Sequence, residues 1–151
     1  WLDADAFTPV GQGMIPTGEI LPVEGTPMDF RAAKSIGADI EADYEQLKIA
    51  GGYDHNFALD KKTKGVEKVA EVSESTSGRT MEVYTDLPGM QLYTGNFIVK
   101  EEGKEGAEYT KRNGVCFETQ YFPNSINIPS FESCLLKAGD TFTSTTIYKF
   151  C

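Results

Sequence analysis

Basic residues, histidine and cysteine are all scarce in this 151-residue sequence. Lys and Arg number 14 against 23 Asp and Glu, which gives a net charge of −9. An acidic mean field repels phosphates, so this balance argues against nucleic acids and anionic membranes as partners. No apolar run approaches the roughly 18 residues that a membrane-spanning helix needs. With one histidine, His55, and no Cys-x-x-Cys pair, the sequence also lacks a pattern typical of zinc sites.

The three cysteines, Cys116, Cys134 and Cys151, are odd in number and widely spaced. We predict a buried, inert thiol at Cys116, which lies in a hydrophobic strand pattern, and an exposed thiol at Cys151. Unpaired cysteines are typical of a reducing compartment, so we expect a cytoplasmic protein. The chain starts at Trp1, directly in a strand-like segment, and we expect it to belong to a longer polypeptide.

Glycine and proline, at 15 and 7 residues, interrupt the sequence so often that few helical windows remain. Between them lie short runs rich in Val, Ile, Thr, Tyr and Phe, which are typical of strands. We predict at least six strands, of which the clearest cover 80–87, 91–100, 115–121 and 141–150. Residues 101–114 are charged and glycine-rich, which indicates a solvated loop, and the pattern at 36–49 fits either a short helix or an irregular loop. The length and the pattern together predict a single all-β, sandwich-like domain.

The run 115–121 alternates cleanly between apolar and polar positions. Glu118 and Gln120 therefore share one face of the predicted strand, while Phe117 lies on the other. A carboxylate in a strand must be solvated, paired or used, because burying it unpaired is costly. Two interpretations remain open for Glu118: a solvent-facing side chain, or a proton-transfer group on a concave sheet face.

Donors and acceptors are also concentrated at 51–57, where two glycines precede Tyr53, Asp54, His55 and Asn56. Such a set with an aromatic ring suits a hydroxyl-rich ligand, because a carboxylate accepts from hydroxyls and a ring covers the apolar face of a sugar. An Asx turn with a structural His55 is the alternative, and both remain open. The segment 88–96 has the same character and carries Gln91 on a predicted strand.

In order along the chain, these segments resemble the aldose 1-epimerases, or galactose mutarotases. Eight motifs carry the resemblance: 15–19 (IPTGE), 25–31 (GTPMDFR), 51–56 (GGYDHN), 77–79 (SGR), 88–96 (PGMQLYTGN), 118–120 (ETQ), 122–129 (FPNSINIP) and 148–150 (YKF). Each motif is weak alone, but eight in register over essentially the whole chain are specific.

The resemblance implies a galactose mutarotase-like large β-sandwich, a supersandwich, of which residues 1–151 form the C-terminal portion. It implies that Glu118 is the general base, that Asp54 holds sugar hydroxyls and that Gln91 contacts ring substituents. Tyr53 and Tyr93 are expected as neighbours of the cleft, without an assigned role. The family's general acid is a histidine in a motif upstream of this sequence, so we expect the isolated chain to be inactive and fragile.

The implied reaction interconverts the α and β anomers of free aldohexoses such as glucose and galactose. It needs no redox step, metal ion or covalent intermediate, so we expect no cofactor and no metal site, and a monosaccharide as the only implied partner. The alternative is a mutarotase-like protein that binds sugars without catalysis or acts on sugar phosphates. Basic residues are sparse near Asp54, Gln91 and Glu118, which favours neutral aldoses.

Overall fold

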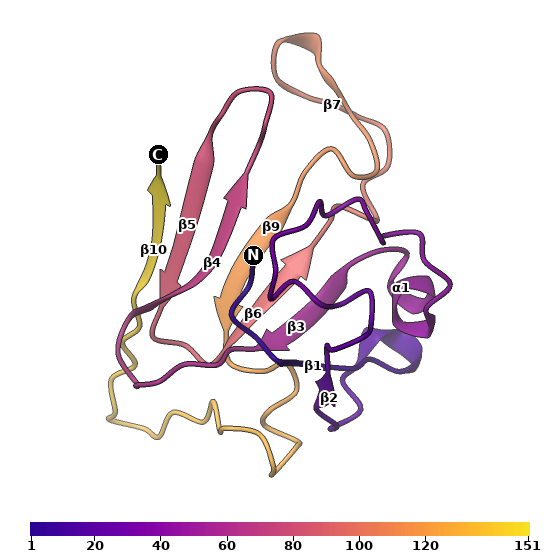
Figure 1. Cartoon of the computed structure of the whole chain (residues 1–151). Helices are drawn as coiled ribbons and strands as arrows, with labels where there is room; N and C mark the ends of the chain where they lie inside the picture. Colours follow the sequence, from indigo (N-terminus) through magenta and orange to yellow (C-terminus); the bar gives the residue numbers. More distant parts are fainter.

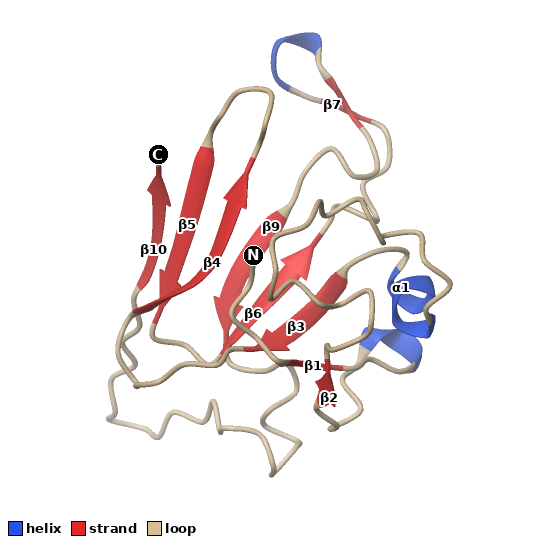
Figure 2. Cartoon of the chain, in the orientation of Figure 1, coloured by secondary structure: helices blue, strands red, loops and turns tan.

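The antiparallel sheets of the structure confirm the all-β prediction. A computed structural model describes residues 1–151, with ten strands and only short helices (Figure 1, Figure 2). The strands are β1 (Ala6–Thr8), β2 (Leu21–Pro22), β3 (Asp54–Ala58), β4 (Glu67–Ser73), β5 (Thr80–Thr85), β6 (Gly89–Tyr93), β7 (Glu101–Glu102), β8 (Glu108–Tyr109), β9 (Cys116–Gln120) and β10 (Thr146–Phe150). The helices are α1 (Glu45–Ala50) and the 3-10 turns η1 (Gln12–Met14) and η2 (Lys104–Gly106). No helix is long and apolar enough to cross a bilayer.

The strands form a five-stranded sheet in the order β2-β1-β3-β6-β9 and a three-stranded sheet in the order β10-β5-β4. Figure 1 shows the two sheets side by side, with the small β7–β8 hairpin extending beyond them. At the junction, the Tyr148 hydroxyl of β10 donates to the Phe117 carbonyl of β9 at 2.6 Å. At the opposite edge of the three-stranded sheet, Leu2 pairs with Ala70 of β4. The two sheets are therefore joined through polar contacts at one place and the N-terminal segment at another.

The pleat of the central strands separates a core face from a polar face. In β3, His55 and Phe57 are buried, whereas Asp54 and Asn56 project to the opposite side of the sheet. A continuous apolar cluster fills the core side and draws residues from both sheets and from the segment before α1. Its buried members are Leu2, Ala4, Phe7, Val23, Met28, Phe30, Ile40, Leu47, Tyr53, Phe57, Val69, Ala70, Val83, Met90 and Leu92.

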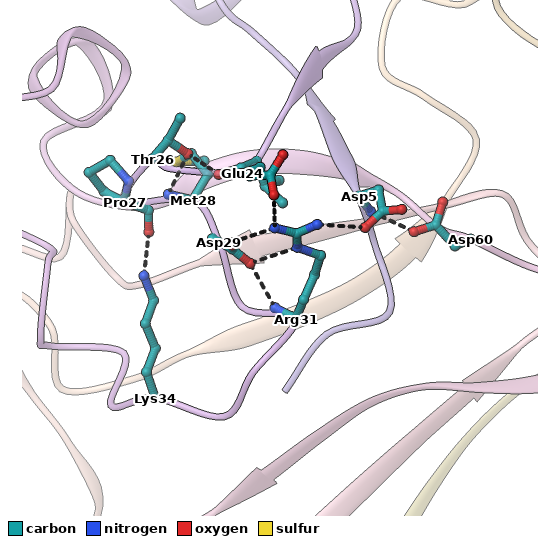
Figure 3. Close-up of polar contacts among 10 residues, drawn as sticks. Asp5, Glu24, Thr26, Pro27, Met28, Asp29, Arg31, Lys34 and Asp60 are labelled. Atoms are coloured by element: carbon teal, nitrogen blue, oxygen red, sulfur yellow. Dashed lines mark hydrogen bonds and ion pairs between the residues drawn. The ribbon is translucent and has the colours of Figure 1, made fainter.

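The motif at 25–31 packs beside β1 and is held there by a guanidinium group (Figure 3). Arg31 donates from Nε and Nη2 to the two oxygens of Asp29, at 3.0 and 2.8 Å, and from Nη1 to Asp5 at 3.2 Å. Glu24 adds a third carboxylate, with its Oε1 3.8 Å from Nη2. The fork geometry of arginine suits this bidentate pairing. These contacts hold the segment 25–31 beside β1. They give the motif a structural role, and none of them involves the polar face of the sheet.

Several predicted boundaries were wrong. The predicted strand 91–100 ends at Tyr93, because Gly95 takes a φ of 64° and the chain turns away. The strand expected over 141–150 starts only at Thr146, and the window 36–49 contains a helix only from Glu45 onward. The segment 101–114 is exposed, as predicted, but contains the short β7–β8 hairpin.

The prediction of a buried thiol at Cys116 was also wrong, since Cys116 is exposed. Strand β9 is the edge strand of the five-stranded sheet, and Phe117 rather than Cys116 points to the core side. Cys134 and Cys151 are exposed as well, and none of the three cysteines forms a disulfide.

Candidate functional site

Three strands of the five-stranded sheet bring the predicted site residues together on its polar face. In the register of β3, β6 and β9, Gln91 lies directly opposite Asn56 on one side and Glu118 on the other. Asp54 belongs to the next row, opposite Tyr93. Because paired strands are about 5 Å apart, side chains in these rows are within reach of one another. Segments far apart along the chain thus form one cluster.

A cavity of about 370 Å³ opens over this cluster. Its lining consists of Asp54, Gln91, Tyr93, Phe97, Glu118, Gln120 and Pro123. All three residues predicted for the site are present, together with one further carboxamide, two aromatic rings and a proline, and no Lys or Arg. Such a lining offers acceptors, donors and an apolar wall, which is the chemistry needed for a neutral polyhydroxylated ligand.

Carboxamide hydrogen bonds connect the lining. Gln91 Nε2 donates to Asp54 Oδ1 at 2.7 Å. Gln120 Nε2 donates to Gln91 Oε1 at 3.0 Å and to Asn56 Oδ1 at 3.1 Å. No hydrogen bond within the chain engages the Glu118 side chain, so this carboxylate faces the cavity with both oxygens available. A carboxylate in this state is free to accept a proton or a hydroxyl hydrogen bond.

A buried polar junction holds the ends of β3 and β6 together beneath the cavity. Asn96 Nδ2 donates to the carbonyls of Ala50 and Tyr53, at 3.1 and 2.8 Å, and Thr94 Oγ1 accepts from the Tyr53 N–H at 3.2 Å. Gly52 has a φ of 142°, and a Cβ there would lie only 2.3 Å from Asn96 Oδ1. The glycine is therefore required both by its backbone conformation and by space. This junction is the physical link between the motifs at 51–56 and 88–96.

Tyr53 does not belong to the cavity, which corrects its expected place as a cleft neighbour. Its side chain is fully buried in the core, where its hydroxyl donates to the Pro27 carbonyl at 2.9 Å. Tyr53 lies next to Asp54 in sequence, and the pleat sends the two side chains to opposite faces. Tyr93, in contrast, lines the cavity as expected.

His55 also lies on the core face, one position after Asp54. Its ring is fully buried and meets Phe7 edge to face, with the ring centroids 6.0 Å apart. The Nδ1 atom accepts from the Asp54 N–H at 3.2 Å, and Nε2 has no hydrogen-bond partner within the chain. Burial lowers the pKa of His55 to about 4, so the ring is neutral at pH 7. Within the segment 51–57, strand β3 starts at Asp54 after a turn at Gly51 and Gly52, and the buried His55 is a structural residue, as in the alternative left open by the sequence.

The carboxylates that line the cavity affect the pKa of two groups on β9 and β10 outside its lining. Burial, followed by the charges of Glu118 and Asp54, raises the pKa of the Cys116 thiol. Burial and the charge of Glu118 also raise the pKa of the Tyr148 phenol. Both shifts have the sign expected where carboxylates disfavour further negative charge.

Phe97, Gln120 and Pro123 are lining residues that the sequence did not identify as site residues. Phe97 stacks on Tyr93 with ring centroids 6.3 Å apart and an angle of 18° between the planes, and 60% of Phe97 is exposed. The Phe97 N–H donates to the Tyr93 hydroxyl at 3.2 Å, which fixes the pair. The alternation that places Glu118 on one face also places Gln120 there, so this signal was present in the sequence. For Phe97 no local pattern exists, because the turn at 94–96 brings it back over the strand.

No group of three or more His, Cys, Asp and Glu side chains is arranged to hold a metal ion. The lining of the cavity offers two carboxylates, two carboxamides and a phenol as hydrogen-bonding groups. Together with the antiparallel sheets, it defines an all-β protein with a carboxylate- and carboxamide-lined cleft. The chain matches the family model for aldose 1-epimerase over residues 1–149 and belongs to the aldose 1-epimerase family.

Related proteins and structures are consistent with this membership. The chain is 45% identical to galactose mutarotase of Sus scrofa over 150 residues, and 36% identical to aldose 1-epimerase of Escherichia coli (strain K12) over 149 residues. These matches cover 99% and 97% of the chain but only 42% and 43% of the relatives. The crystal structure of an aldose epimerase homologue from C. elegans superposes with a TM-score of 0.81 at 27% identity, over 99% of this chain and 44% of that one. The expected galactose mutarotase-like fold is confirmed, and the chain spans less than half the length of these relatives.

Proposed function

We propose that this chain carries the base and two sugar contacts of an aldose 1-epimerase, which interconverts the α and β anomers of free aldohexoses such as glucose and galactose. The observation that carries the proposal is the convergence of Asp54, Gln91 and Glu118, from three different strands, on one cavity. The names of the relatives, galactose mutarotase and aldose 1-epimerase, support the reaction class. The substrate would be a monosaccharide bound with its hydroxyls toward Asp54 and Gln91.

In this proposal Glu118 acts as general base. Its carboxylate takes the proton from the C1 hydroxyl while an acid protonates the ring oxygen, and the C1–O5 bond breaks to give the free aldehyde. Rotation about C1–C2 presents the other face of the carbonyl. The O5 hydroxyl then attacks C1, and the two protons return by the reverse transfers. The unpaired state of the Glu118 side chain supports this role, because a base must be free to approach the proton it removes.

The acid is not His55 in this proposal. His55 is fully buried on the opposite face of the sheet from the cavity, and its low pKa leaves it without a proton to give at pH 7. We therefore propose that residues 1–151 form the C-terminal portion of a single aldose 1-epimerase domain and that the acid comes from another part of that domain. The coverage of 42% of the mutarotase from Sus scrofa supports this division. We call this chain together with the rest of the family domain the complete enzyme.

A sugar-phosphate substrate is a weaker candidate. A phosphate group is recognised by clustered Arg or Lys, and the cavity lining contains neither. A purely sugar-binding protein has no need of an unpaired carboxylate such as Glu118. Both alternatives predict that loss of the Glu118 charge does not greatly change the rate of mutarotation of free aldoses.

The decisive experiment is Glu118→Gln in the complete enzyme, followed by polarimetry with freshly dissolved α-galactose or α-glucose. The change keeps the shape and removes the base, so we expect kcat to fall by about 10²–10⁴-fold while sugar binding is largely kept. Glu132→Gln, an exposed glutamate outside the cavity, is the matched control and should leave the rate unchanged. A Glu118→Gln enzyme with more than half of the original rate would exclude Glu118 as the base.

The isolated chain provides a second test. We expect it to catalyse no mutarotation above the buffer background, because no acid is positioned for the ring oxygen. Substantial activity of a monomeric 151-residue chain would show that a lining residue serves as the acid. We further propose a reducing, cytoplasmic location, supported by three exposed and unpaired cysteines. Titration of all three thiols in protein purified without reductant would test this.

A further inference from the structure

A chain of side-chain amides crosses three strands on the polar face of the sheet. It starts at Asn56 in β3, passes through Gln120 in β9 and Gln91 in β6, and ends at Asp54 in β3. Both contacts of Gln120 are made by its Nε2 group, at 3.0 and 3.1 Å, so both of its N–H bonds are used within the protein. Beyond Asn56, its Nδ2 donates to Thr8 Oγ1 at 3.4 Å.

The direction of these hydrogen bonds is fixed at one end by the negative charge of Asp54. An ionised carboxylate only accepts hydrogen bonds, so Gln91 must turn its N–H group toward Asp54 and its carbonyl oxygen away. That oxygen then needs a donor, which Gln120 supplies. If the Gln91 amide were reversed, its oxygen would face the Asp54 carboxylate and its N–H would face the N–H of Gln120. Each link thus excludes the reversed orientation of the next.

Gly89 supplies the space for this arrangement. It lies in β6 opposite Gln120, and a Cβ at this position would be 2.4 Å from Asn56 Oδ1 and 2.8 Å from Phe122 Cδ1. Its backbone needs no positive φ, so the requirement is one of space and not of conformation. The missing side chain is what lets Asn56 of β3 meet Gln120 of β9 over the strand between them.

We propose that Gln120 is a positioning residue that sets the hydrogen-bonding polarity of Gln91, and that this polarity determines which sugar groups the site accepts. This proposal rests on the proposed function. With Gln91 so oriented, its second N–H and Oδ2 of Asp54 have no hydrogen-bond partner within the chain, and they offer one donor and one acceptor on two groups that are themselves hydrogen-bonded. A hydroxyl group satisfies both at once, because it donates to the carboxylate and accepts from the amide. An aldose that lacks this hydroxyl leaves both protein groups unpaired.

The test uses Gln120→Met in the complete enzyme, because methionine has similar length and no hydrogen-bonding amide. Loss of the hydrogen bond that orients Gln91 should raise KM for galactose about tenfold and change kcat less than about threefold. Gln12→Met, the same substitution at an exposed glutamine, is the matched control and should change neither. An unchanged KM with a collapsed kcat would overturn the proposal.

A double-mutant cycle separates positioning from a general structural effect. Since Gln120 acts through Gln91, Gln120→Met should add nothing to KM in a Gln91→Met background. Additive effects would overturn the proposal. Gly89→Ala should mimic Gln120→Met, because it displaces Asn56 from the other side, and Gln120→Glu should exceed both, because a carboxylate opposes Gln91 Oε1 with another acceptor.

A final measurement does not depend on catalysis. In the complete enzyme, the side-chain amide resonances of Gln91 should shift in Gln120→Met and in Gly89→Ala, and remain unchanged in Gln12→Met. Unshifted resonances in both variants would overturn the positioning role even if the enzyme is active. If the amide resonances respond as expected but the complete enzyme neither binds nor epimerises aldoses, the proposed function fails and the orientation of Gln91 stands.

Discussion

Gln91 and Asp54 are joined by a 2.7 Å hydrogen bond that runs diagonally across β3 and β6, not between directly paired residues. The residue opposite Gln91 is Asn56, and the residue opposite Asp54 is Tyr93. Diagonal contacts of this kind are within reach of long side chains in a twisted sheet. The bond leaves Asp54 Oδ2 without a partner from the Gln91 amide, so the carboxylate keeps an acceptor for a ligand.

Asp54→Asn should weaken substrate binding more than it slows the chemical step. The amide oxygen of the new side chain still accepts from Gln91, but the free acceptor becomes an amide donor and a sugar hydroxyl loses its charged partner. We expect a cost of about 1.5–3 kcal/mol, which appears as a rise in KM. Measurement of kcat and KM in the complete enzyme checks this. A collapsed kcat with an unchanged KM would make Asp54 a proton-transfer residue.

Tyr53→Phe should destabilise the protein without affecting sugar binding. Its hydroxyl is the donor to the Pro27 carbonyl inside the core, so its loss should lower the free energy of unfolding by about 1 kcal/mol. Tyr93→Phe is the matched variant on the cavity side and should alter sugar affinity instead. Urea unfolding and sugar titration of both variants provide the comparison. A change in affinity for Tyr53→Phe alone would place that residue back at the cleft.

Stability should fall as the pH is lowered from 7 to 5. Burial lowers the pKa of His55 from 6.5 to about 4 in the folded chain, so between these values the unfolded chain binds a proton that the folded chain does not. This linkage is absent well above pH 6.5 and should remove about 2 kcal/mol of stability by pH 5. Urea unfolding at the two pH values measures it.

The control for this prediction is His55→Gln. Whatever its effect on the absolute stability, it should abolish most of the pH dependence between 7 and 5. Asp60, whose pKa is raised mainly by burial, acts in the opposite direction at lower pH, so the interval ends at 5. An unchanged slope in His55→Gln would assign the effect to other groups.

Cys116 should report on the charge of Glu118 without any enzymatic assay. Because burial and the neighbouring carboxylates raise its pKa, its thiolate fraction at pH 8 is small and alkylation should be slow. Glu118→Gln should accelerate the reaction roughly twofold, and so should added salt, which screens the charge. Peptide mapping after brief iodoacetamide treatment identifies the site. Equal rates in the two proteins would separate Cys116 from the field of Glu118.

Local pattern was sufficient where a single strand decides the outcome. The alternation at 115–121 predicted that Glu118 and Gln120 share a face, and the structure has them so, because the pleat of a strand leaves no other choice. The same alternation places Cys116 on the face of Glu118 and Gln120, and the structure has Cys116 exposed. The wrong prediction of a buried thiol came from the hydrophobic character of the run as a whole, which does not say which face of an edge strand is covered.

The order of the motifs along the chain likewise could not predict which segments contact one another. The motifs placed Asp54, Gln91 and Glu118 in the site, but their meeting depends on β6 pairing with both β3 and β9. Phe97 joined the cavity because a turn after Tyr93 reverses the chain, where the sequence suggested that the strand continued.

The sequence by itself therefore determined the class of fold and the shared face of Glu118 and Gln120, since side-chain alternation and turn residues act over a few neighbours, whereas Asp54, Gln91 and Glu118 were named together only by the resemblance to the aldose 1-epimerases. Only the tertiary structure decided that Tyr53 and His55 are core residues. It also decided that Gly89 leaves the space in which Asn56 and Gln120 meet, and that the Gln91 amide donates to Asp54. These features depend on strand pairing and on distances between atoms far apart in sequence, and a local pattern contains neither.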